Sequence, residues 1–199
     1  MTLLLFVKNP FPGHTKTRLA ATVGHPLALK MYERLCDWTR DQAQRLPDVE
    51  RHLYYSQHVP ERDAWPTADF RKFVQQGEGL GDRMEDAFAR TFAGDGGPAI
   101  IIGTDCPGIT TEYLAEAFRA LEEHDVVVGP ALDGGYTLLG MRRLHPTLFR
   151  DVEWSTDRVL PTTLDRAAAA GLTVRQLAPL RDVDHEEDWY AYGWTLPKL

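Results

Sequence analysis

Short runs of apolar residues alternate along the chain with stretches in which apolar residues recur every three or four positions. The runs 99–103 and 125–129 are almost wholly apolar, which is typical of strands buried on both faces in a parallel sheet covered by helices. The same criterion predicts strands at residues 3–7, 51–55, 72–74, 99–103, 125–129, 136–140 and 172–177.

Helices are predicted between these strands. In residues 28–38 the apolar positions step by three and four, so that they share one helical face. Similar spacing predicts helices at residues 84–92, 114–121 and about 157–170, the last ending at Gly171. Strand–helix alternation over the whole chain predicts one α/β domain, residues 1–199, with a mostly parallel sheet. Ligands bind beyond the carboxyl ends of such strands, so the loops there are the candidates for chemistry.

The composition narrows the class of protein. A chain of 199 residues with 43% hydrophobic and 26% charged residues is typical of one globular domain with its own core. No apolar run is long enough to cross a bilayer, and residues 3–7 lack the preceding basic segment of a secretion signal. The net charge of −7 disfavours nonspecific nucleic-acid binding. With only two cysteines, we expect a cytoplasmic protein without nucleic-acid or membrane partners.

The segment after the first predicted strand, residues 8–19, is basic and contains Gly13, Lys16 and Arg18. A glycine turn before a helix exposes backbone N–H groups, and two cations suit polyphosphate oxygens. The Gly-Lys-Ser/Thr ending of a P-loop is absent, so a phosphate-binding loop and a solvated basic loop are equally good interpretations. As exposed loop cations, Lys16 and Arg18 are expected to contribute little to stability.

Carboxylates follow the apolar segments at two places. Asp105 comes after a buried strand, where one carboxylate can hold a magnesium ion that also binds phosphates. Alternatively, Asp105 is a turn residue. Asp182 and Asp184 share one face of an extended segment, although Asp184 could instead cap the helix predicted to follow. Cys106 is the weaker candidate, a nucleophile without a matched histidine.

The Asp-Gly-Gly sequence at residues 133–135 joins two predicted strands. It is a strong turn signal on its own. Two adjacent glycines also let a ligand lie directly against the backbone. Both interpretations of Asp133, Gly134 and Gly135 stay open at the level of sequence.

These motifs, in this order and over nearly the whole chain, resemble the bacterial DUF2064 family. Its members are assigned as glycosyltransferases within the nucleotide-diphospho-sugar transferase (GT-A) superfamily. The family is also similar to phospholactate/phosphoenolpyruvate guanylyltransferases and, more distantly, to molybdenum-cofactor nucleotidyltransferases. The matching segments are residues 6–13, 16–19, 76–84, 103–107, 129–136, 154–156 and 182–184. The resemblance implies a three-layer α/β/α domain of the GT-A type, with a mixed, mainly parallel sheet.

The resemblance also implies roles for particular residues. Lys16 and Arg18 would grip phosphates and, with Asp105, form the catalytic group. Asp105, Asp182 and Asp184 would coordinate Mg²⁺ or Mn²⁺. Residues 76–81 would lie near the nucleobase, and the Asp-Gly-Gly turn near the acceptor or sugar. The implied substrate-binding residues are Gly13, Gln76, Gly77, Gly81, Arg83, Asp133, Gly134 and Gly135. The chain departs from the family pattern at His14, often a basic residue, and at His185, often threonine.

The predicted function is that of a metal-dependent transferase that uses a nucleoside triphosphate or a nucleotide sugar and a small-molecule acceptor. In nucleotidyl transfer the acceptor attacks the α-phosphorus, whereas in glycosyl transfer it attacks the sugar carbon. Lys16 and Arg18 favour the first, because they suit a triphosphate, and 199 residues leave little room for an acceptor subdomain. The family assignment favours the second. A non-catalytic nucleotide-binding accessory protein is the third alternative.

Overall fold

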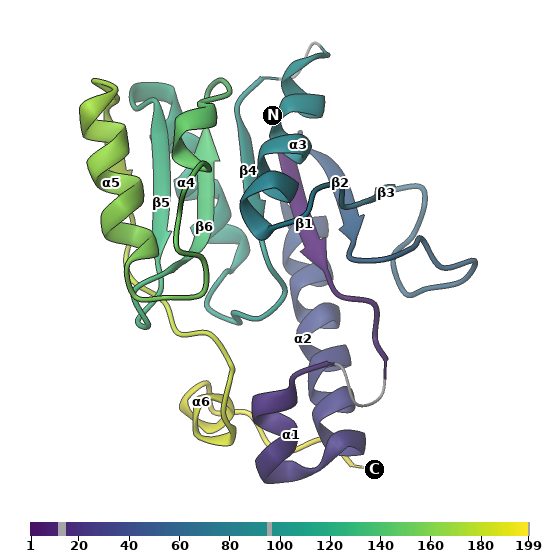
Figure 1. Ribbon diagram of the computed structural model, residues 1–199. Coiled ribbons are helices and arrows are strands. Elements are labelled where there is room, and N and C mark those ends of the chain that lie inside the picture. The colour runs from purple at the N-terminus through teal and green to yellow at the C-terminus, as the bar shows by residue number, and fades with distance from the viewer. Residues whose placement is uncertain (12–14, 95–96, 199) are drawn as a thin grey trace.

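The computed structural model describes residues 1–11, 15–94 and 97–198, and its centre is a seven-stranded sheet (Figure 1). The strand order is β3-β2-β1-β4-β6-β5-β7, and β6 alone runs antiparallel to its neighbours within this sheet. The strands are β1 (Thr2–Val7), β2 (Glu50–Tyr55), β3 (Arg71–Val74), β4 (Ala99–Ile102), β5 (Val126–Pro130), β6 (Tyr136–Met141) and β7 (Val174–Gln176). The predicted mixed, mainly parallel sheet is therefore confirmed.

Helices cover both faces of the sheet. On one face α2 and α4 pack against Leu3, Ile100 and Val127, and on the other α3 and α5 pack against Leu4 and Ile101. Residues of β1 and β4 alternate between these two cores because successive strand side chains point to opposite faces. The helices are α1 (Thr17–Val23), α2 (His25–Arg45), α3 (Leu80–Phe92), α4 (Thr111–Glu123), the 3-10 helix η1 (Pro146–Leu148), α5 (Val159–Ala169) and α6 (Glu186–Ala191).

A third apolar cluster holds the C-terminal segment against the first helices. Trp189 and Val183 pack there with Leu19, Met31 and Leu35, from α1 and α2. Trp189 is a fully buried anchor for α6. Since burying such a large aromatic side chain is strongly favourable, the cluster positions the residues just before α6.

The element boundaries differ in detail from the sequence prediction. The last predicted strand shrinks from six residues to Val174–Gln176, the helix predicted at residues 28–38 extends over His25–Arg45, and a separate helix, Thr17–Val23, precedes it before Gly24. Gly24 has φ of 82°, a left-handed conformation that glycine adopts without steric cost. None of the described helices has the length and apolar character needed to span a membrane.

The carboxyl ends of the parallel strands face the side on which α1 and α6 lie (Figure 1). The chain reaches this edge repeatedly, after β1, β2, β4 and β5. The side chains predicted for chemistry are placed by these loops. Gly13, one of the predicted substrate contacts, lies outside the described residues.

Candidate active site

One backbone hydrogen bond joins the two carboxylate segments. The amide of Val183 donates to the carbonyl oxygen of Asp105 at 2.9 Å. Val183 is fully buried, so the residues on either side of it, Asp182 and Asp184, are held beside the loop that follows β4. The sequence placed Asp105 and the Asp-x-Asp pair about eighty positions apart, and the fold brings them together.

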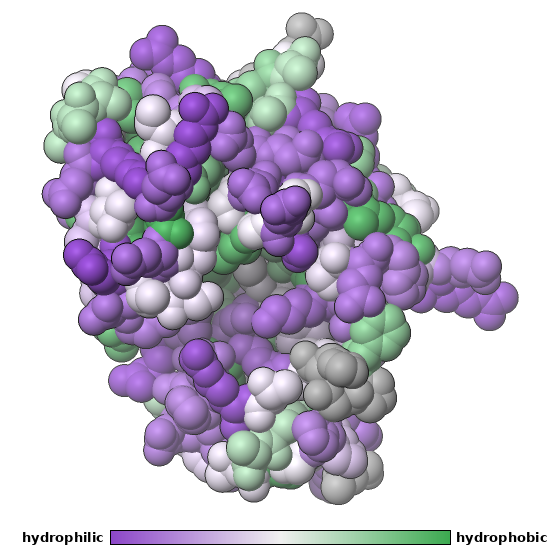
Figure 2. Space-filling model, in the orientation of Figure 1, coloured by the Kyte–Doolittle hydropathy of each residue, from purple (hydrophilic) through white to green (hydrophobic). Residues whose placement is uncertain are grey.

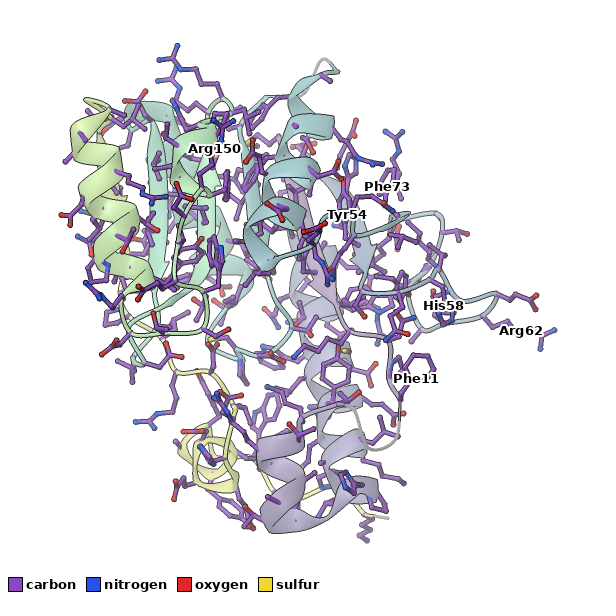
Figure 3. All side chains as sticks on the ribbon, viewed as in Figure 1. Phe11, Tyr54, His58, Arg62, Phe73 and Arg150 are labelled. Atoms are coloured by element: carbon purple, nitrogen blue, oxygen red, sulfur yellow. The ribbon has the colours of Figure 1, made fainter. Side chains whose placement is uncertain are left out.

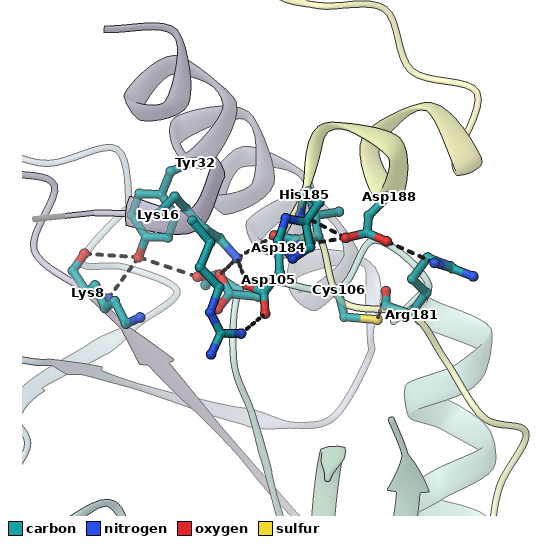
Figure 4. Close-up of polar contacts among 12 residues, drawn as sticks. Lys8, Lys16, Tyr32, Asp105, Cys106, Arg181, Asp184, His185 and Asp188 are labelled. Atoms are coloured by element: carbon teal, nitrogen blue, oxygen red, sulfur yellow. Dashed lines mark hydrogen bonds and ion pairs between the residues drawn. The ribbon is translucent and has the colours of Figure 1, made fainter. Parts of the chain in front are cut away.

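The ammonium group of Lys16 lies among these carboxylates (Figure 4). Lys16 Nζ is 3.0 Å from Asp105 Oδ1 and 3.5 Å from Asp184 Oδ1, and it donates to the carbonyl oxygen of Val183 at 2.7 Å. The lysine backbone is left-handed, with φ of 52°, which is uncommon for a residue with a side chain. Strain of this kind is frequent at functional sites.

Lys16 and Arg18 differ sharply in burial. The Lys16 side chain is 4% exposed, whereas that of Arg18 is 67% exposed and its NH1 lies 3.0 Å from Asp184 Oδ2. The expectation that both are exposed loop cations is therefore wrong for Lys16. Its stem packs below the surface and its charge is surrounded by carboxylates, while Arg18 remains available to a ligand in solution.

Burial and neighbouring charges shift the protonation equilibria of this cluster. Burial by itself lowers the pKa of Lys16, but the carboxylates of Asp105 and Asp184 outweigh it and hold the pKa above its usual value. Burial, with the negative charge of Asp105, raises the pKa of Asp182 to about 7, although Lys16 opposes this shift. The charged form of Asp182 is therefore disfavoured unless a further cation lies beside it.

The alternative that Asp184 caps α6 is wrong. His185 is the residue at the N-cap position, and the carboxylate of Asp188 accepts the amide hydrogens of His185 at 2.8 Å and Asp184 at 3.1 Å. Arg181 in turn lies 2.9 Å from Asp188. Because Asp188 accepts the backbone amides at the start of the helix, the carboxylate of Asp184 is left to pair with Lys16 and Arg18.

Cys106 has the environment of a structural cysteine. Its thiol donates to the carbonyl oxygen of Arg181 at 3.3 Å and lies 3.7 Å from the Tyr192 hydroxyl. Burial raises the pKa of the thiol to about 12, so the thiolate that a nucleophile needs is strongly disfavoured. Cys106 helps to hold the Asp182–Asp184 segment against the loop after β4.

A cleft of about 610 Å³ opens over the carboxylate cluster. In Figure 2 the surface is hollowed between the part formed by α3 and α5 and the part formed by α1 and α6, and the rim is mostly hydrophilic. Lys8, Lys16 and Arg18 line one side of the cleft, which we call the near wall. A second group of lining residues, which we call the far wall, consists of Asp133, Gly135, Tyr136, Trp154, Ser155, Thr156 and Asp157.

An adjoining cavity of about 360 Å³ extends the cleft between β1 and α3. It shares Lys8 and Asp105 with the cleft, and Arg83, a predicted substrate contact, lines it. Gln75 lines the cavity, whereas its predicted neighbour Gln76 is absent from the described lining. Both volumes fall within the range of small-molecule sites. The two cavities share five lining residues at the carboxyl edge of the sheet, Lys8, Leu80, Asp105, Tyr136 and Asp182.

The predicted glycine contacts lie against protein segments. A Cβ on Gly81 would be 2.6 Å from Trp154 Nε1, and one on Gly134 would be 2.6 Å from the Cα of Asp157. Gly77 has φ of 128°. Gly81 and Gly134 let the start of α3 and the turn around residue 134 pack closely on the segment 154–157, which belongs to the far wall. Their contact with substrate stays a prediction.

Several cleft residues had no assigned role in the sequence. Lys8, directly after β1, reaches both cavities, and Tyr136 and Leu80 line both as well. A basic residue at the end of a buried strand was the available signal for Lys8. Ser155 lines the cleft with a left-handed backbone, φ 65°. Local sequence does not predict this position, because the conformation is a property of the folded loop.

The strand end that carries Lys8 is held in place from the opposite side. The Tyr32 hydroxyl donates to the carbonyl oxygen of Lys8 and accepts its amide, at 3.0 and 2.8 Å. Beyond this wall lies a separate cavity of about 530 Å³, and the rings of Phe11 and His58, 6.0 Å apart, lie at its edge (Figure 3). The hydrogen bonds of Tyr32 thus hold the backbone of Lys8, a near-wall residue, in place.

Across residues 1–11, 15–94 and 97–198, no three side chains of His, Cys, Asp or Glu come close enough together to hold a metal ion on their own. Magnesium commonly takes only one or two protein carboxylates and completes its shell with water and phosphate oxygens. The described carboxylates can therefore supply part of a coordination shell, and water and the phosphate oxygens of a nucleotide would complete it.

The fold and the cleft define the class of protein, that of the nucleotide-diphospho-sugar transferase fold. Residues 39–156 match the DUF2064 family, described as an uncharacterized protein conserved in bacteria. A Desulfovibrio desulfuricans G20 protein assigned as a nucleotide-diphospho-sugar transferase is 32% identical, with a TM-score of 0.86 over 92% of this chain and 82% of its own. The chain belongs to the DUF2064 family.

More distant structures share the fold. CMP:2-keto-3-deoxy-manno-octonic acid synthetase, in complex with CTP, has 10% identity and a TM-score of 0.57, over 96% of this chain and 97% of its own. Rv0371c of Mycobacterium tuberculosis H37Rv, in complex with manganese, has 15% identity and a TM-score of 0.55, over 95% and 96%. No curated protein matches the chain in sequence. The prediction of a transferase is confirmed at the level of the fold shared with these proteins.

Proposed function

We propose that the protein is a metal-dependent transferase that binds a nucleoside polyphosphate in the cleft and transfers part of it to a small acceptor. The observation that carries the proposal is the arrangement of Lys16 between Asp105 and Asp184, with Arg18 on the outer side of Asp184. It unites two cations with the carboxylates at the carboxyl edge of the sheet, where ligands bind in open α/β folds.

The near wall is the part of the cleft that would bind the phosphates. Arg18 is exposed and offers a guanidinium that can take phosphate oxygens in a bidentate manner. Lys8 lines both cavities and pairs with no carboxylate among the described residues. Lys16 lies deeper, where it neutralises the carboxylates and presents its charge to the inner end of the cleft. The three cations line the same cleft and would together bind the oxygens of a polyphosphate.

The carboxylates fit a divalent cation. Asp184 pairs with Lys16 and Arg18 and Asp105 pairs with Lys16, but Asp182 makes no ion pair among the described side chains. Asp105 and Asp182 would hold the ion, which when bound supplies charge neutralisation to the phosphates and to the leaving group. Five carboxylates against three cations line the described cleft, so polyphosphate binding needs additional positive charge. The manganese in a structure of the same fold supports this assignment.

Nucleotidyl transfer is the chemistry that the near wall favours. Attack on the α-phosphorus releases pyrophosphate, and the cations Lys8, Lys16 and Arg18 are placed to stabilise its growing charge. The CTP in a synthetase of the same fold supports a triphosphate as the substrate. Glycosyl transfer is the second candidate. The 32% identical relative, assigned as a nucleotide-diphospho-sugar transferase, is the observation that favours it.

Binding measurements test the proposal and separate its two chemistries. Thermal-shift screening of nucleoside triphosphates, diphosphates and nucleotide sugars, with and without magnesium, should identify a stabilising nucleotide. Calorimetry with that base series should then show the triphosphate binding about tenfold more tightly than the diphosphate, because one more charge-assisted contact is made. Preference for the diphosphate or its sugar would establish glycosyl transfer instead. Absence of any magnesium-dependent binding would refute the proposed function.

A further inference from the structure

Cations and unpaired carboxylates occupy different parts of the described cleft lining, and Asp105 and Asp184 pair with Lys16 beside the near wall. The three cations that line the described cleft, Lys8, Lys16 and Arg18, all belong to the near wall. The described far wall carries Asp133 and Asp157 and no lysine, arginine or histidine. The two walls therefore suit different parts of a substrate pair, since a phosphate that is attracted to one wall is repelled by the other.

The hydrogen-bonding groups of the far wall are largely free. Asp133 Oδ1 accepts the amide of Gly135 at 3.0 Å, while Asp133 Oδ2 and the carboxylate of Asp157 have no partner among the described residues. Ser155 adds a hydroxyl group to the same wall, whereas the hydroxyl of Thr156 donates to the carbonyl oxygen of Glu153 at 2.7 Å and accepts the amide of Arg158 at 3.3 Å. Ionised carboxylates are acceptors only, so they need a ligand that brings O–H or N–H donors.

The far wall also has an aromatic surface. The rings of Tyr136 and Trp154 meet edge to face with centroids 6.4 Å apart, and both residues line the cleft. The Tyr136 hydroxyl is buried without a hydrogen-bond partner among the described atoms. Aromatic rings beside free carboxylates and hydroxyls offer apolar contact to C–H groups and acceptors to hydroxyl groups of one ligand.

The far wall adjoins the carboxylate cluster. Asp133, on the far wall, lines the same cleft as Asp105, Asp182 and Asp184. A ligand on the far wall would thus face the phosphates of a nucleotide held by Lys16 and Arg18, which is the position of an acceptor.

We infer that the far wall binds an uncharged polyhydroxylated acceptor, a sugar or polyol, and discriminates against phosphorylated acceptors. This inference rests on the proposed function, because the bound polyol is an acceptor only if a nucleotide occupies the near wall. Asp133 and Asp157 accept hydrogen bonds from the hydroxyls of the acceptor, and the rings of Tyr136 and Trp154 pack against its carbon skeleton. A phosphate monoester would bring two negative charges against two unpaired carboxylates.

Ligand-observed NMR titrations of matched pairs test the inference. The probes are glycerol with glycerol 3-phosphate, D-glucose with glucose 6-phosphate, and D-mannose with mannose 6-phosphate. They are titrated into the full chain with magnesium, before and after addition of the nucleotide that gives the largest thermal shift. At least one neutral member should bind about tenfold more tightly than its phosphate ester.

Charge-reversal variants locate the site. Asp157→Lys should weaken binding of the neutral member and strengthen binding of the phosphate ester, so that the preference within a pair shrinks or reverses. The matched control is Asp165→Lys, the same change at an exposed position of α5 outside the cleft lining, and it should leave the preference unchanged. Thermal unfolding of both variants establishes that each is folded.

The outcomes separate this inference from the proposed function. The polyol assignment is overturned if the wild-type chain binds a phosphate ester more tightly than its neutral partner, or if it binds neither member in any of the three pairs. It is also overturned if the two variants have equal effects on the preference. In these cases an intact magnesium-dependent thermal shift with nucleotide leaves the proposed function standing. Loss of nucleotide binding itself would count against the proposed function instead.

Discussion

The amide of Val183 donates a 2.9 Å hydrogen bond to the carbonyl oxygen of Asp105, and this contact assembles the candidate site. Asp182 and Asp184, on either side of Val183, come to lie beside the loop after β4, and Lys16 Nζ binds the Val183 carbonyl from the opposite direction. The backbone of one buried residue thus positions two carboxylates and a cation. Its apolar side chain, fully buried in the cluster under α1 and α6, holds that backbone in place.

Replacement of the two near-wall cations should separate a structural from a purely ligand-binding role. Lys16→Ala removes the buried counterion of Asp105 and Asp184, and we expect the free energy of unfolding to fall by about 2 kcal/mol, because carboxylates at a partly desolvated site lose their partner. Arg18→Ala should change stability by less than about 0.5 kcal/mol, since Arg18 is 67% exposed. Urea unfolding measures both values.

The same two variants should both weaken binding of the stabilising nucleotide in calorimetry, each by about tenfold. Equal stability of the Lys16 and Arg18 variants would contradict the buried position of the lysine. Unchanged nucleotide affinity in both would show that the cations serve the protein's own carboxylates only.

Asp182→Asn should stabilise the metal-free protein. Asp182 is partly buried next to the carboxylate of Asp105, so removing its charge relieves repulsion, and we expect a gain of about 1 kcal/mol in the free energy of unfolding in EDTA. Magnesium with nucleotide should raise the melting temperature of the wild-type chain and have a much smaller effect on the variant. Asp165→Asn, an exposed position on α5, is the control and should behave as the wild type does. An unchanged magnesium response in Asp182→Asn would remove this residue from the proposed metal site.

Gly81→Ala should destabilise the fold through crowding at the far wall. The added Cβ would lie 2.6 Å from Trp154 Nε1 and 2.7 Å from the carbonyl oxygen of Phe149, so the segment carrying Trp154 must move. We expect a loss of about 1–3 kcal/mol, the usual cost of overpacking. Gly103→Ala is the matched control because nothing lies within 4 Å of its added Cβ, and its effect should stay within about 0.5 kcal/mol. Equal thermal stability of the two variants would mean that the helix start and the far wall are not in contact.

Acid unfolding should report on Asp63, which lies outside the cleft. Burial alone raises the pKa of this carboxyl group, but hydrogen bonds from Lys72, Tyr55 and the Trp65 amide outweigh it and hold the pKa below its usual value. A carboxyl group whose pKa is lowered by folding stabilises the protein above its unfolded pKa, near 4, and loses that contribution as the pH falls through the lowered pKa. Asp63→Asn should therefore cost about 1 kcal/mol at pH 6.

The difference in unfolding free energy between the wild type and Asp63→Asn should shrink steadily below about pH 4. Urea titrations at a series of pH values measure it. The exposed Asp165→Asn variant should show little difference from the wild type over the same range. A difference for Asp63→Asn that stays constant down to the acid transition would contradict the stabilised carboxylate.

The sequence by itself determined the class of fold. Continuous apolar runs such as residues 99–103 and apolar positions at three- and four-residue spacing are local properties, and they are enough to predict buried strands, covering helices and a mainly parallel sheet. They also directed attention to the loops at the carboxyl edge, where Asp105, Lys16 and Arg18 lie.

Only the tertiary structure decided how those residues meet. The burial of Lys16 and the pairing of Asp184 with Arg18 depend on contacts between segments far apart in the chain. The same holds for the far wall, where Gly81 and Gly134 admit residues 154–157. Periodicity encodes which face of an element is apolar, but which loops touch follows from the packing of whole layers. The chemistry of the cleft is therefore a property of the assembled fold.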